Sequence, residues 1–147
     1  MPIKNFELSL IDAQRLIDSK EKPKQIRIDH NTTITRITEI DESTVEIVFR
    51  YTVSYGHVGT IRIEGKLHYG GEAKEILALW AEERRMKNKI AEEVHNVILN
   101  NGSFEALQIS RKVNLPPPIK MEIPRVKFSD KKKSEKKDSY DYSPEVA

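Results

Sequence analysis

The order of the predicted elements constrains the fold of this chain most. Three segments with alternating apolar and polar residues run from about residue 25 to residue 69, and a largely helical block follows from about residue 72 to residue 112. Short turns separate the three segments, so they predict antiparallel strands in sequential order. The apolar face of such a sheet needs a cover, which the helical block can provide. The sequence therefore predicts an α+β fold, in which an antiparallel sheet of three to four strands, in meander or Greek-key order, is covered on one face by helices.

The clearest strand covers residues 44–55, and the next covers residues 58–69. In both segments alternate residues are apolar or glycine and share one face: Val45, Ile47, Phe49, Tyr51, Val53, Ile61, Ile63, Gly65, Leu67 and Tyr69. The first strand, residues 25–40, changes phase between Ile34 and Ile37. A change of phase turns the side chains to the other face of a sheet, so we expect a bulge or bend near residues 31–35.

The remaining segments allow two interpretations each. Residues 8–18 have apolar side chains at helical spacing and predict a short amphipathic helix, with a strand over residues 6–11 as the alternative. Helices are predicted over residues 72–85 and 88–100, followed by a new helix from Ser103. One continuous helix through Gly102 is the alternative, at a cost of about 1 kcal/mol relative to alanine.

Composition divides the chain and excludes several classes of protein. We expect an N-terminal helical or strand segment with a loop over residues 1–23, an α+β domain over residues 24–126, and a disordered, Lys-rich charged tail over residues 127–147. The absence of cysteine excludes disulfides and thiolate metal sites. A net charge of +2 is too small for a domain that coats nucleic acid. No long apolar run or signal peptide is found, so we expect a cytoplasmic protein that does not insert into membranes.

No arrangement of residues predicts catalysis. The 4 histidines match no metal-ligand spacing. The adjacent carboxylates Glu82 and Glu83, like Glu92 and Glu93, diverge around a helix and do not converge on one substrate. No glycine-rich phosphate loop is present. We therefore expect no enzyme activity, no cofactor and no metal site.

Several stretches resemble SecB, the export chaperone. The strand Val45-Glu-Ile-Val-Phe-Arg-Tyr-Thr-Val53 is similar to a strand of that family, and so is the following Ile63-Glu-Gly65. The stretch Ala91–Phe104 resembles its long helix, and Asn114-Leu-Pro-Pro-Pro-Ile119 resembles the exit from that helix. The resemblance covers about residues 24–121. It implies a homo-oligomer, a dimer or dimer of dimers (tetramer), that holds unfolded polypeptides or preproteins for protein export in apolar grooves without ATP.

This resemblance also implies a client-binding site. The candidate residues are Ile76, Leu79 and Trp80 on the first helix, and Leu115, Ile119 and Met121 on the exit segment. For Trp80, packing in the core is the alternative interpretation. Two other functions remain open: a dedicated adaptor for one protein partner, such as an antitoxin chaperone, and a binding module for RNA or ribosomes that uses the Lys-rich tail. Nucleic acid is the less expected partner because acidic residues interrupt the lysines of that tail.

Overall fold

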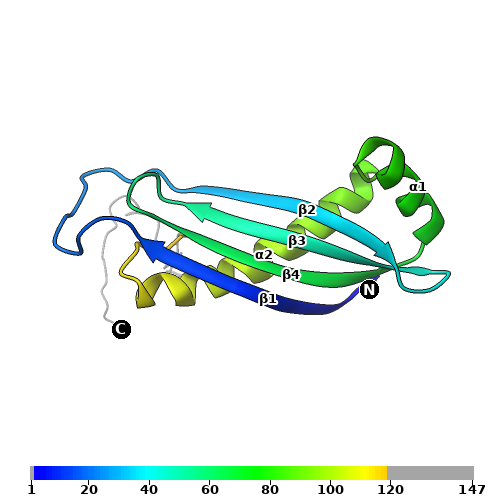
Figure 1. Cartoon of the computed structure of the whole chain (residues 1–147), viewed down its shortest axis with the longest axis horizontal. Helices are drawn as coiled ribbons and strands as arrows, with labels where there is room; N and C mark the ends of the chain where they lie inside the picture. Colours follow the sequence, from blue (N-terminus) through cyan, green and yellow to red (C-terminus); the bar gives the residue numbers. More distant parts are fainter. Residues whose placement is uncertain (1, 119–147) are drawn as a thin grey trace, which may run out of the picture.

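The computed structural model of the chain describes residues 2–118. Its elements, in chain order, are β1 (Ile3–Arg15), β2 (Asp29–Glu39), β3 (Thr44–Ser54), β4 (Gly59–Gly70), α1 (Ala73–Glu83) and α2 (Asn88–Lys112). The four strands form one antiparallel sheet in the order β1-β4-β3-β2, and α2 crosses one face of this sheet diagonally (Figure 1). The sheet is thus a β2-β3-β4 meander that β1 extends in Greek-key fashion, which confirms the predicted fold class.

The core lies between the helices and the two central strands. All of the predicted inward residues of β3 and β4 are buried, and the fully buried Tyr51 lies opposite Ile63 in the register of the two strands. The first strand adds Phe6, whose ring stacks on Phe49 with 5.2 Å between the ring centroids. The strict alternation of β3 and β4 therefore reflects one fully covered face, as the sequence predicts.

The predicted helix over residues 8–18 is wrong, because residues Ile3–Arg15 form a strand that pairs with β4. The register of this pair shifts between Lys4 and Glu7 and again between Leu8 and Leu10. Each shift inserts one extra residue, so Leu8 and Ile11 face the same side although they are three positions apart in sequence. Because of these two bulges, the inward-facing apolar residues of β1 are spaced along the sequence as they would be on one face of a helix.

The predicted irregularity in β2 is confirmed. The register of β2 against β3 shifts between Ile34 and Arg36, and the hydroxyl of Thr35 donates a hydrogen bond of 3.2 Å to the carbonyl of Val48. After this shift Ile37 again faces the core, where it is buried. The strand itself starts at Asp29, later than the predicted start at residue 25.

A single helix, α2, runs through Gly102, so the predicted break before Ser103 is wrong. Gly102 is buried, and a Cβ atom there would lie 2.6 Å from Cδ2 of Tyr51. Glycine thus allows the helix to approach the sheet closely, and packing of the helix outweighs its low helical propensity. Buried residues recur at every fourth position along α2: Ile90, Val94, Ile98, Gly102, Ala106 and Ser110.

Candidate functional site

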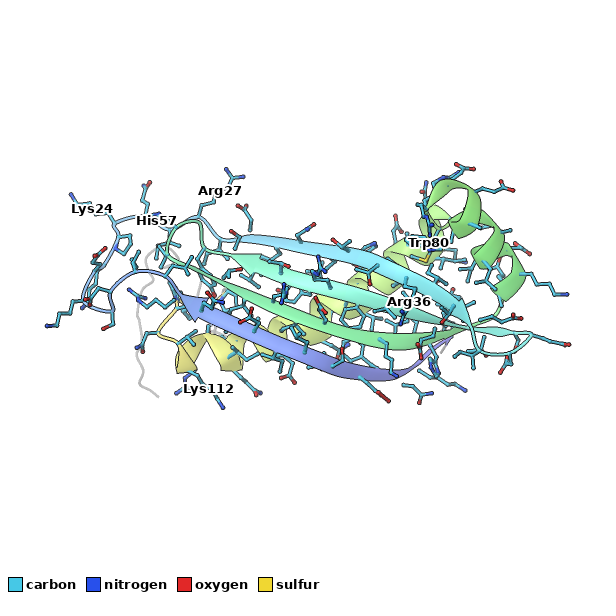
Figure 2. All side chains as sticks on the ribbon, in the orientation of Figure 1. Lys24, Arg27, Arg36, His57, Trp80 and Lys112 are labelled. Atoms are coloured by element: carbon cyan, nitrogen blue, oxygen red, sulfur yellow. The ribbon has the colours of Figure 1, made fainter. Side chains whose placement is uncertain are left out.

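Helix α1 lies beside β2 and β3 at one end of the sheet and presents part of its apolar surface to solvent. Ala73 and Ile76 are buried beneath the helix. Leu79 and Trp80 are half-buried, and Figure 2 shows Trp80 at the end of the molecule that carries α1. Trp80 packs against the core cluster on one side and leaves the rest of its indole accessible. Trp80 is therefore neither a fully buried core residue nor a fully exposed one, and its role in client binding stays a prediction.

Arg84 covers one face of the Trp80 ring. The helix ends at Arg84, which has a left-handed backbone with φ of 55° and donates its backbone N–H to the Trp80 carbonyl over 2.9 Å. This turn brings the guanidinium to 5.7 Å from the centroid of the indole, a distance typical of a cation–π contact.

Lys87 ties the connection between the helices to the first turn of α1. Its ammonium donates to Glu75 over 2.8 Å and to Glu72 over 3.0 Å. The hydrogen bond from Lys87 holds the pKa of the Glu75 carboxyl below its usual range. Met86 beside it is buried in the core cluster. The connection is therefore anchored on both sides, which gives Trp80 a defined position.

The exit segment after α2 is bound to the opposite end of the sheet. Leu115 is buried and packs over Gly59, where a Cβ atom would lie 2.8 Å from a Leu115 methyl group. Prolines 116–118 have no backbone N–H groups, but their carbonyl groups still accept hydrogen bonds. The Tyr55 hydroxyl donates to the Pro116 carbonyl over 2.8 Å, and His30 Nε2 donates to the Pro118 carbonyl over 2.9 Å.

His30 connects this segment to the core. Because a carbonyl can only accept, Nε2 of His30 carries the hydrogen in the bond to Pro118, and in that tautomer Nδ1 accepts from the Tyr51 hydroxyl over 2.6 Å. Burial raises the pKa of Tyr51 to about 12, so this hydroxyl remains a donor at neutral pH. The imidazole therefore has a structural role, which its sequence context did not reveal.

The structure does not bring the predicted client-binding residues together. Ile76, at 2% exposed, and Leu115, at 5%, belong to the core. Helix α1 follows Gly70 at one end of β4, whereas Leu115 packs on Gly59 at the other end. The two remaining predictions, Ile119 and Met121, lie outside the described residues, as does the predicted tail over residues 127–147. Within the described chain, Leu79 and Trp80 are the predicted residues that retain accessible surface.

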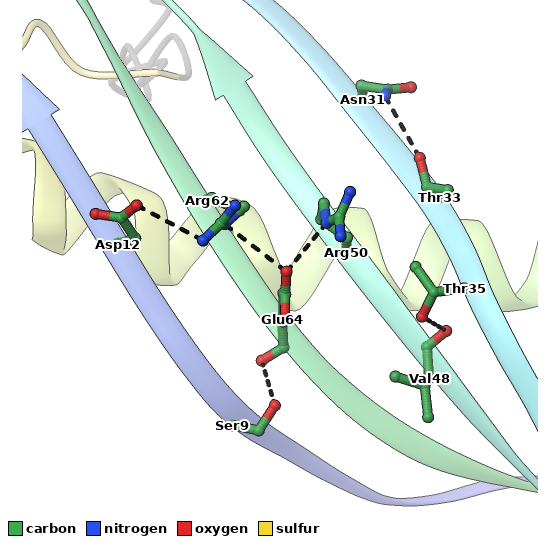
Figure 3. A network of polar contacts seen from close by, with 9 residues as sticks. All are labelled: Ser9, Asp12, Asn31, Thr33, Thr35, Val48, Arg50, Arg62 and Glu64. Atoms are coloured by element: carbon green, nitrogen blue, oxygen red, sulfur yellow. Dashed lines mark hydrogen bonds and ion pairs between the residues drawn. The ribbon is translucent and has the colours of Figure 1, made fainter.

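The sheet face opposite the helices is polar. Arg50 donates to Glu64 over 3.0 Å, and Arg62 lies 3.7 Å from Glu64 and 3.8 Å from Asp12 (Figure 3). Charges of both signs thus alternate across three strands, and this face presents no continuous apolar surface.

Among residues 2–118 no group of three His, Cys, Asp or Glu side chains is placed to hold a metal ion. None of the described helices is long and apolar enough to cross a membrane.

Exposed apolar residues that sequence analysis missed lie on β1 and on α2. Ile11 is 50% exposed, Leu10 lies on the same strand, and Phe104 of α2 is 62% exposed. Ile11 pairs with the inward-facing Ile63, so Ile11 and Phe104 both lie on the helical side of the sheet. The incorrect helix prediction for this segment concealed that β1 is an edge strand with such residues.

Comparisons with known proteins identify the fold as SecB-like. A SecB-like chaperone of Mycobacterium tuberculosis, solved in complex with a ChAD peptide from an antitoxin, superimposes with a TM-score of 0.50. The two chains are 15% identical, and the match covers 86% of this chain and 91% of that chain. No family model matches the sequence. No curated protein matches it either.

Proposed function

We propose that this protein is an ATP-independent chaperone that binds unfolded polypeptides on apolar surface. The observation that carries the proposal is the accessible apolar surface of Leu79 and Trp80 on a SecB-like fold. Apolar contact is non-directional, so such a surface binds many sequences without a reaction. Arg84 would move from the Trp80 ring when a client side chain takes its place. No catalytic step is part of this function, and we place the protein in the cytoplasm.

A dedicated adaptor is the second candidate. The structural neighbour was solved with a peptide from an antitoxin, and this chain shares its fold. A dedicated adaptor would bind one partner tightly, whereas a general holdase would bind many unfolded chains weakly. The range of clients therefore separates the two functions.

Self-association through β1 is part of the proposal. An edge strand presents unpaired backbone groups that a second copy can cover, and symmetric dimers are the commonest homo-oligomers. After its second bulge, the stretch from Leu10 to Arg15 keeps an unbroken register with β4. Ile11 lies in this regular stretch, and Phe104 lies on the same side of the sheet. Sedimentation of the wild type and of Ile11→Asp tests this: a dimer that becomes a monomer supports the assignment, and a monomeric wild type contradicts it.

Suppression of aggregation tests the function. An unrelated unfolding protein is mixed with the full chain without ATP at low and at high salt. We expect suppression that persists at high salt and that is weakened several-fold by Trp80→Ala or Leu79→Ser. Ala78→Ser, at an exposed position of the same helix, is the matched control. Unchanged suppression by folded Trp80→Ala and Leu79→Ser would remove α1 from the site, and no suppression by the wild type would favour the dedicated adaptor.

A further inference from the structure

Basic side chains gather at the end of the molecule where β1 leads into β2 and where α2 stops. This basic end comprises exposed Lys20, Lys22, Lys24, Arg27, Arg111 and Lys112. Figure 2 shows Lys24, Arg27 and Lys112 together at this end, opposite the end with Trp80. Asp18, Glu21 and Asp29 are the acidic residues of the same loop and strand start. Basic side chains therefore outnumber acidic ones at this end, although the two kinds are equal in number over the described chain.

Arg15 holds the parts of the basic end together. Its Nε donates to the Ile17 carbonyl over 3.2 Å, and its Nη2 donates to the carbonyls of Glu21 over 2.8 Å and Asp18 over 3.3 Å. Its Nη1 donates to the carbonyl of Asn114, just beyond α2. One guanidinium thus binds the β1–β2 loop to the end of α2. The loop lysines and the two basic residues in the last turn of α2 are consequently carried by segments that one side chain joins.

An exposed apolar residue begins the loop that carries these lysines. Leu16 is 56% exposed, and its position is fixed because its backbone N–H donates to the Val58 carbonyl over 2.7 Å. Among the described residues, Lys20, Lys22 and Lys24 form no ion pair, and their ammonium groups extend from the loop that begins at Leu16. The surface therefore offers apolar contact beside unneutralised positive charge.

We propose that the basic end binds a polypeptide segment that carries acidic residues beside an apolar side chain. Carboxylates of the segment would pair with the loop lysines, and its apolar residue would cover Leu16. Complementary charge of this kind sets specificity and association rate more than affinity. Leu16 favours a polypeptide over a nucleic acid as the ligand. A polypeptide has aliphatic side chains that can pack on Leu16, whereas a sugar-phosphate backbone has none. This inference rests on the proposed function and names a chemical class of client that α1 alone would not select.

Two labelled peptides test the proposal with the full chain. Both are unstructured and of equal length and apolar content; one contains a cluster of Asp and Glu, and the other contains Asn and Gln at those positions. Fluorescence anisotropy at low salt should show tighter binding of the acidic peptide. Lys22→Ser/Lys24→Ser should weaken that binding about three- to tenfold, since each exposed ion pair contributes modestly. Leu16→Ser should weaken binding of the acidic peptide as well.

The control variant is Lys74→Ser/Lys89→Ser, which removes the same charge from exposed sites at the α1 end and should leave the preference unchanged. Equal binding of both peptides by the wild type would overturn the inference while leaving the proposed function intact, whereas binding of neither would count against both. A single-stranded oligonucleotide is the third probe. If it binds more tightly than the acidic peptide and Leu16→Ser has no effect on either ligand, the basic end is a nucleic-acid surface and the inference is wrong.

Discussion

Gly102 of α2 packs directly on the ring of Tyr51 on β3. A Cβ atom on Gly102 would lie 2.6 Å from Cδ2 and 3.1 Å from Cε2 of that ring. The other end of the Tyr51 side chain is also held in place, because its hydroxyl is 2.6 Å from Nδ1 of His30. The ring therefore cannot move away without breaking this hydrogen bond. Helix α2 can pack this closely on the sheet only because Gly102 has no Cβ atom.

Gly102→Ala should destabilise the fold although alanine is the better helix former. The gain in helical propensity is about 1 kcal/mol, whereas overpacking a core commonly costs about 1–3 kcal/mol. We expect the free energy of unfolding in urea to fall by up to about 2 kcal/mol, the difference between these two terms. Asn96→Ala, an exposed position of the same helix, is the control and should be neutral or stabilising. A Gly102→Ala variant more stable than the wild type would show that the ring moves aside at little cost.

Tyr51→Phe should loosen the exit segment. The substitution keeps the ring but removes the donor to His30, whose other nitrogen holds the Pro118 carbonyl. We expect the free energy of unfolding to fall by about 1 kcal/mol, the usual contribution of one hydrogen bond. Limited proteolysis at the C-terminal side should become faster than in the wild type. Tyr55→Phe, which removes the bond to Pro116, should act in the same direction, and no effect of either substitution would contradict the bound exit.

His95 should make the fold less stable in mild acid. Burial lowers the pKa of this histidine below its usual value of 6.5, so the unfolded chain binds a proton at higher pH than the folded chain. The free energy of unfolding should therefore fall as pH drops from about 7.5 through the unfolded pKa towards 5. His95→Gln should reduce this slope, which urea unfolding at several pH values measures. His57→Gln, on an exposed turn, is the control; an equal change of slope in both variants would exclude a specific role for His95.

Arg15→Met should release the β1–β2 loop. Four carbonyl groups lose their donor, among them those of Glu21 and Asn114. We expect a loss of about 1–3 kcal/mol, because hydrogen bonds to charged groups are stronger than neutral ones. Hydrogen exchange should rise in residues 16–28 more than in β3. Arg27→Met, an exposed neighbour paired with Asp29, should leave exchange there nearly unchanged. Equal exchange in the wild type and Arg15→Met would show that the loop is held by other contacts.

Much of the fold follows from sequence because β3 and β4 alternate without interruption. The face of each strand is then fixed by its own residues, as the buried Ile47 and Ile61 show. The N-terminal strand could not be predicted in this way, because its bulges are visible only against the partner strand. Gly102 was misread for a related reason: whether a glycine ends a helix or fits beneath a ring depends on Tyr51, which lies far away in sequence.

The candidate site was less accessible to sequence reasoning. Leu79 and Trp80 were proposed from the resemblance to SecB, but their separation from Leu115 depends on the register of the sheet. The basic end depends on tertiary hydrogen bonds of Arg15, which join residues that lie far apart along the chain. Such long-range contacts leave no recognisable pattern in the sequence around each residue, so they could not be predicted.

The pairing of β1 with β4 also determines the order in which the sheet can form. Ile3 lies opposite Tyr69 and Arg15 lies opposite Gly59, so this half of the sheet consists of long-range contacts. The β2-β3-β4 meander needs only neighbouring hairpins and can form first. Because high contact order slows folding, we expect docking of β1 to be the late step of the reaction. During synthesis, the apolar residues of β1 therefore lack their partner strand β4 until about seventy residues have left the ribosome.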